Sequence, residues 1–115
     1  MNIQALIRAT GIGTALQVGM VVAGHFAPVL QDPGFAIGGM GFSAVAGWLY
    51  ARAAPGGWGP ALGGGAIAGG VCALLGIAVS VLLGDVPASL LALGTAGSVV
   101  TGVAGAALAQ ILRRK

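Results

Sequence analysis

Only a few side chains of this sequence could do acid–base, metal or nucleophilic chemistry, and they form no cluster along the chain. Away from the ends of the apolar segments, His25 and, more weakly, Cys72 are the candidates. The two carboxylates, Asp32 and Asp85, are 53 residues apart and fall in predicted turns, so no pair is placed for acid–base catalysis. No His and Cys residues have metal-ligand spacing, and the glycine runs lack the lysine followed by serine or threonine of a phosphate-binding loop. We therefore expect no enzyme activity, no metal and no cofactor.

One polar stripe runs along the first apolar segment. Thr14, Gln17 and His25 project from one side of a helix wheel, within an arc of about 100°. Polar side chains in a membrane segment face the protein interior or a water-filled path rather than lipid. The stripe therefore predicts a path for a small solute, which protonation of His25 could gate, since histidine commonly changes charge near pH 6.5. In the alternative interpretation, Gln17 and His25 only hydrogen-bond to neighbouring helices, at about 0.6 kcal/mol per contact.

The composition indicates a membrane protein. Of the 115 residues, 57% are hydrophobic and 6% are charged, whereas soluble domains carry about 25% charged residues. Four uncharged intervals are each long enough for the roughly 20 residues that cross a bilayer core, and a Pro- and Gly-rich stretch divides the second from the third. We predict a single all-α membrane domain over 1–115. Its four transmembrane helices lie at about 9–30, 34–53, 61–83 and 87–112 and form two tandem antiparallel hairpins.

The positive charges predict the orientation of these helices. All five lie near the N-terminus, in the second loop or at the C-terminus: Arg8, Arg52, Arg113, Arg114 and Lys115. Cytoplasmic loops and tails of membrane proteins carry the excess of Lys and Arg. We therefore expect a multi-pass protein of the bacterial inner (plasma) membrane with both termini cytoplasmic. The net charge of +3 is then explained by topology and anionic lipid, so we expect no nucleic-acid partner.

The first and third predicted turns have related chemistry. Asp32 comes directly before Pro33, and Asp85 comes two residues before Pro87. An aspartate followed by proline is typical of a capped helix start, so both aspartates are predicted to be helix caps. The shared turns also suggest a repeat of two parallel hairpins. A chance match within a composition rich in Gly, Ala, Val and Leu is the alternative.

Small residues recur at helical spacing on the second, third and fourth predicted helices. The predicted packing positions are Gly39, Ser43, Gly47, Gly65, Gly69, Gly76, Ser80 and Gly102. Small residues four apart allow helix backbones to approach each other in a bilayer, as in a glycine zipper. A genome that favours Gly and Ala would instead scatter such residues without meaning. Because these stripes outnumber what one loose four-helix bundle requires, we expect a homo-oligomer or a larger membrane complex.

Three functions fit this architecture. The first is a small oligomeric channel or transporter for a small solute, with Thr14, Gln17 and His25 along its path. The second is a non-catalytic structural or accessory subunit that docks on a larger membrane complex. The third is a holin-like pore former, suggested by the small size and the basic C-terminal tail.

Overall fold

The chain folds into four helices, and the computed structural model describes residues 3–27, 29, 34–53 and 57–114. The helices are α1 (Ile3–Phe26), α2 (Gly34–Ala53), α3 (Trp58–Leu82) and α4 (Leu90–Arg114), and the described ranges contain no strand. Three of them, α1, α3 and α4, are long and apolar enough to cross a membrane. The predicted all-α class is therefore confirmed, and three of the predicted spans correspond to helices of this kind.

The helix ends differ from the predicted ones. α1 begins at Ile3 rather than near residue 9, because the exposed Arg8 is carried on the outside of a continuing helix. α3 begins at Trp58, so that Pro60 lies in its first turn, where backbone N–H groups have no helical partner to lose. α4 begins at Leu90, three residues later than predicted.

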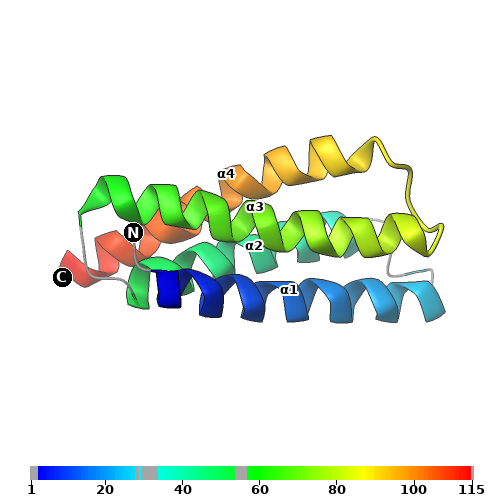
Figure 1. Cartoon of the computed structure of the whole chain (residues 1–115), viewed down its shortest axis with the longest axis horizontal. Coiled ribbons are helices and arrows are strands. Elements are labelled where there is room, and N and C mark those ends of the chain that lie inside the picture. Colours follow the sequence, from blue (N-terminus) through cyan, green and yellow to red (C-terminus); the bar gives the residue numbers. More distant parts are fainter. Residues whose placement is uncertain (1–2, 28, 30–33, 54–56, 115) are drawn as a thin grey trace.

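The four helices run alternately up and down the long axis of the molecule, and both termini lie at the same end (Figure 1). α1 and α4 each pack against both α2 and α3, whereas α1 and α4 do not pack against each other within the described residues. α2 and α3 therefore form the central pair. The molecule measures 42 × 23 × 20 Å, and its length matches a bilayer with its headgroup regions, about 40–45 Å.

The backbones of α2, α3 and α4 approach closely in the half of the bundle that holds the termini. A Cβ atom built at Gly47 of α2 would meet the carbonyl of Gly102 in α4, and one built at Gly102 would meet the carbonyl of Gly65 in α3. A Cβ atom at Gly69 of α3 would lie 2.8 Å from the Ser98 carbonyl oxygen of α4, which is closer than real Cβ contacts come. Any side chain at these positions would separate the helices.

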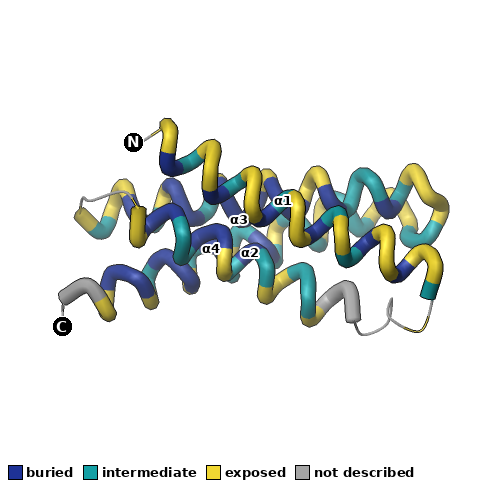
Figure 2. Tube along the Cα trace, turned by 90° about the horizontal axis from the view of Figure 1, so that it is seen from below, coloured by how far each residue is buried: buried dark blue, intermediate teal, exposed yellow. Residues whose placement is uncertain are grey.

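The opposite half of the bundle is packed less closely. The buried positions of α4 lie between Ser98 and Gln110, and none of its residues 90–97 is buried (Figure 2). The first turns of α4 lean away from the other helices (Figure 1). The residues of α4 near the α3–α4 turn are therefore less enclosed by the other helices than those from Ser98 onward.

A glycine ends α3 and sets the path of this turn. Gly84 has a φ of +80°, in the left-handed region that side chains disfavour. Its N–H donates to the Val81 carbonyl and the Asp85 N–H donates to the Ser80 carbonyl, both at 3.0 Å, which is the Schellman arrangement. Asp85 thus lies in the turn, three residues after the end of α3 at Leu82, and α4 starts only at Leu90. The carboxylate of Asp85 is directed to α1 instead of capping α4 as predicted, and Asp32 lies outside the described residues.

Candidate solute-binding cavity

A buried polar cluster joins α1, α2 and α3 around the Gln17 side chain. Gln17 is 2% exposed, and its Nε2 donates to the Gly39 carbonyl at 2.9 Å and to Ser43 Oγ at 3.1 Å. Ser43 Oγ in turn donates to the Gly69 carbonyl at 3.2 Å, and the Cys72 thiol donates to the same carbonyl at 3.3 Å. The two hydrogens of Gln17 Nε2 are shared among the Gly39 carbonyl, Ser43 Oγ and, at 3.8 Å, Cys72 Sγ. The cluster therefore fixes which end of the Gln17 amide faces α2.

The small residues around the cluster make room for the Gln17 side chain. A Cβ atom built at Gly76 of α3 would lie 2.7 Å from Gln17 Cβ, and one at Gly13 of α1 would lie 3.0 Å from Cys72 Sγ. Gly39 on the other side would place its Cβ 3.4 Å from Gln17 Oε1. Substitution at Gly76 would thus displace the side chain that organises the cluster.

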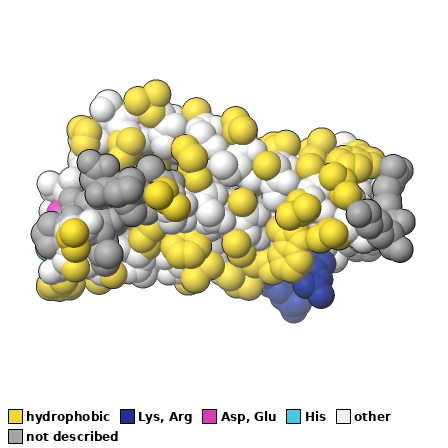
Figure 3. All heavy atoms as spheres, turned by 180° about the vertical axis from the view of Figure 1, so that it is seen from behind, with side chains coloured by type: hydrophobic (Ala, Val, Ile, Leu, Met, Phe, Trp, Pro, Cys, Tyr) yellow, Lys and Arg dark blue, Asp and Glu magenta, His cyan; other side chains and the backbone are white. Residues whose placement is uncertain are grey.

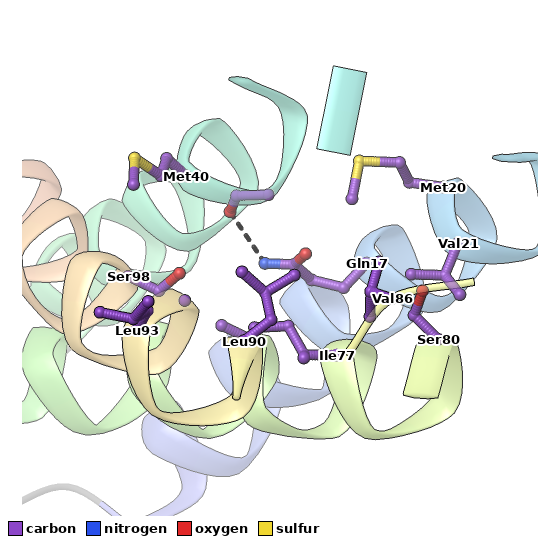
Figure 4. A pocket seen from close by; sticks show the side chains of 13 residues that line it. Gln17, Met20, Val21, Met40, Ile77, Ser80, Val86, Leu90, Leu93 and Ser98 are labelled. Carbon is purple, nitrogen blue, oxygen red and sulfur yellow. Dashed lines mark hydrogen bonds between the residues drawn. The ribbon is translucent and has the colours of Figure 1, made fainter. Parts of the chain in front are cut away.

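A cavity of about 300 Å³ begins at Gln17 and extends toward the α3–α4 turn (Figure 4). All four helices line it. The residues are Gln17, Met20 and Val21 of α1, Gly39 and Met40 of α2, Ala73, Ile77 and Ser80 of α3, and Leu90, Leu93, Gly94 and Ser98 of α4, with Val86 from the turn. None of these carries a charge, and the polar side chains among them are Gln17, Ser80 and Ser98. The cavity is therefore an apolar space with a few hydrogen-bonding groups, as is usual for small-molecule sites.

The cavity has an open side between α2 and α4. Met40 is 41% exposed and Leu93 is 72% exposed, and both contribute to its lining. At its inner end lies the close contact of α2, α3 and α4, where a Cβ atom at Gly69 would meet the backbone of Ser98. Within the described residues, the space is thus open on one side and closed toward the end with the termini.

His25 lies at the end of α1, apart from Thr14 and Gln17. Its Nδ1 is 3.0 Å from Asp85 Oδ2, with 37% of the His25 side chain and 14% of the Asp85 side chain exposed. Thr14 lies one turn before Gln17, and its buried Oγ1 has no hydrogen-bond partner in the described part of the chain. The structure thus places Gln17 on the cavity wall and places His25 at the end of α1, where it contacts Asp85 of the α3–α4 turn. Val86 of the same turn lines the cavity.

The predicted packing positions divide among three places. Gly47, Gly65, Gly69 and Gly102 lie at the close contact of α2, α3 and α4, and Ser80 lies on the cavity wall. Gly39, Ser43 and Gly76 surround Gln17. The apolar lining residues were not predicted, because nothing in an apolar helix distinguishes a leucine on a cavity wall from one that faces lipid.

Comparison of the chain with protein-family models, with curated proteins and with solved structures finds no match. The functional argument therefore depends on the cavity and on the chemistry of its wall.

Proposed function

We propose that all four helices, α2 included, cross the bacterial inner membrane with both termini in the cytoplasm. Two features support this topology. Of the charged side chains that the structure describes, Arg8 near the start of α1 and Arg52 in the last turn of α2 lie toward the end with the termini, whereas Asp85 lies in the α3–α4 turn at the other end. On the face that Figure 3 shows, hydrophobic side chains are spread along the length between the two ends. Arg52 also stacks on Trp48 at 4.9 Å, a pair typical of the membrane–water interface.

We propose that the protein is a transporter that takes a small uncharged solute into the cavity beside Gln17. The cavity is the observation that carries this proposal, because a space of about 300 Å³ inside a small bundle needs an occupant or a use. An ion would find no opposite charge on the described wall, and burying an unpaired charge is expensive. A carrier fits better than an open channel, because the close glycine contacts of α2, α3 and α4 lie at the inner end of the cavity and leave no continuous path there through the described part of the bundle.

In this proposal the glycine contacts form the fixed base of the carrier. The zipper of Gly47, Gly65, Gly69 and Gly102 holds three backbones together, and the α3–α4 turn bounds the cavity at the other end. The pair of His25 and Asp85 attaches this turn to α1. Release of that pair would free the turn, and this gives His25 the gating role expected for it.

The transport proposal is tested by filling the cavity. The purified protein is reconstituted in proteoliposomes, and the entry of urea, glycerol and benzyl alcohol is followed by stopped-flow light scattering against protein-free liposomes. Leu90→Trp places a larger side chain on the cavity wall, whereas Leu74→Trp makes the same change on α3 at a side chain that is 43% exposed. We expect Leu90→Trp to abolish a protein-dependent flux that Leu74→Trp preserves. Fluxes that equal those of empty liposomes for every solute would end the proposal.

A second candidate is a subunit that assembles with further copies or with a larger complex. One exposed stripe of α1 supports it: Gly11, Ala15 and Gly19 are exposed at four-residue spacing, and nothing lies within 4 Å of a Cβ built at Gly11 or Gly19. Native mass spectrometry of the nanodisc-embedded protein tests this candidate. Gly11→Leu together with Gly19→Leu should dissociate an oligomer, and a monomeric wild-type protein would refute assembly with further copies.

A further inference from the structure

One hydroxyl group on the cavity wall lacks a hydrogen bond. Ser80 of α3 is 2% exposed, lines the cavity, and its Oγ has no partner in the described residues. A serine in a helix can donate to the carbonyl four residues earlier, but this hydroxyl does not do so. Buried polar groups in native proteins are nearly always hydrogen-bonded, so an orphaned hydroxyl at a cavity indicates a partner from outside the chain.

Gln17 presents a second free polar atom to the same cavity. Its Nε2 is occupied by Gly39 and Ser43, and this fixes the amide so that Oε1 is the remaining acceptor. Oε1 lies between α2 and α3, since a Cβ built at Gly39 would be 3.4 Å from it and one built at Gly76 would be 3.6 Å from it. Gly76 is one helical turn before Ser80, and in Figure 4 the Gln17 side chain lies between Ser98 on one side and Ser80 on the other. A free acceptor from α1 and a free hydroxyl from α3 therefore line the same cavity.

The rest of the wall limits what the occupant can be. Beyond Gln17, Ser80 and Ser98, the lining residues have no polar side-chain group, so most of the ligand surface meets hydrocarbon. A cavity of about 150 Å³ is known to hold benzene, so about 300 Å³ suits a molecule of roughly a dozen non-hydrogen atoms. The exposed Met40 and Leu93 at the open side offer an apolar entrance from the bilayer.

We propose that the cavity binds a neutral, mainly apolar molecule that carries one hydroxyl group, which donates to Gln17 Oε1 and accepts from Ser80 Oγ. This inference names the class of solute for the proposed transporter and rests on that proposal for its biological use. Binding itself does not require transport. The two can therefore be tested separately.

The test compares two probes that differ by one hydroxyl, 1-naphthol and naphthalene. Their binding to the nanodisc-embedded protein is measured by equilibrium dialysis, with empty nanodiscs as the blank. We expect saturable binding of both, with 1-naphthol at least about 5-fold tighter, as two net hydrogen bonds give. Ser80→Ala removes one of these two hydrogen bonds, so it should reduce the preference by about 2–10-fold and leave naphthalene binding unchanged. The matched control is Ser89→Ala, the same change at an exposed position next to α4.

Ser80→Ala removes a hydroxyl that makes no hydrogen bond in the described residues, so the variant is expected to fold, and its thermal unfolding checks this. The inference is overturned if nothing binds above empty nanodiscs, if the two probes bind equally, or if Ser80→Ala keeps the preference. It is also overturned if native mass spectra show a phospholipid retained in the wild type and expelled by Leu90→Trp, because an acyl chain would then be the occupant. Flux without a hydroxyl preference would refute only this inference, and the preference without flux would refute only the transport proposal.

Discussion

Replacement of Gly69 by alanine tests whether α3 depends on its backbone contacts. A Cβ atom at Gly69 would lie 2.8 Å from Gly102 Cα, 2.8 Å from the Ser98 carbonyl oxygen and 3.2 Å from the Ser43 carbonyl oxygen. Ordinary van der Waals contact begins at 3.4 Å. The neighbours are backbone atoms of α2 and α4, which cannot move aside by changing a rotamer. Gly69→Ala therefore has to push α3 away from two helices at once.

The magnitude follows from a matched substitution in the same helix. Gly63 has nothing within 4 Å of a built Cβ, so Gly63→Ala gains only helix propensity, up to about 1 kcal/mol. Gly69→Ala gains the same propensity and adds the strain of overpacking, typically about 1–3 kcal/mol. We therefore expect Gly69→Ala to be about 1–3 kcal/mol less stable than Gly63→Ala.

Equilibrium unfolding in mixed detergent micelles, followed by circular dichroism, measures this difference. Gly69→Ser would add a Cβ in the same place and should therefore also be less stable than Gly63→Ala. If Gly69→Ala is as stable as Gly63→Ala, α3 does not depend on the close contact, and the steric argument fails.

Three further changes test other parts of the fold in the same unfolding assay. Gln17→Leu leaves the Gly39 carbonyl without its donor and should destabilise the protein by about 1–3 kcal/mol, so an unchanged stability would contradict the role of the cluster. Gly84→Ala forces a side chain into a left-handed backbone and should cost about 1–2 kcal/mol, whereas no change would mean that the turn adopts another conformation. Asp85→Asn weakens an exposed pair with His25 and should change stability by less than about 1 kcal/mol, so a larger loss would show that the pair is a structural lock.

Much of the fold could be predicted from the sequence because hydropathy alone marks long apolar helices. The helix ends were harder to predict. The predicted start near residue 9 leaves Arg8 outside the first helix. A long cationic side chain can, however, lie along the outside of a helix with its charge in the headgroup region, so α1 continues back to Ile3. The predicted start of the fourth helix depends on Pro87. The observed start at Leu90 depends instead on the turn that follows the left-handed Gly84, and the proline does not indicate the conformation of that turn.

The candidate site was predictable only in part. A glutamine in an apolar segment signals a buried polar contact, and Gln17 makes three, with Gly39, Ser43 and Cys72. The partner of His25 was not foreseen, because a contact across 60 residues depends on which turn lies beside the end of α1. The cavity itself was not predicted either, since it results from the tilt of α4.

The uneven packing of the bundle has a mechanical consequence. Residues 90–97 of α4 contain no buried position, whereas the close backbone contacts with α2 and α3 begin near Ser98. A rotation of this segment about Ser98 would change the volume of the cavity without breaking those contacts. The α4 helix can thus act as a lever with its fulcrum at the glycine contacts, and its stiffness would decide how readily the cavity fills and empties.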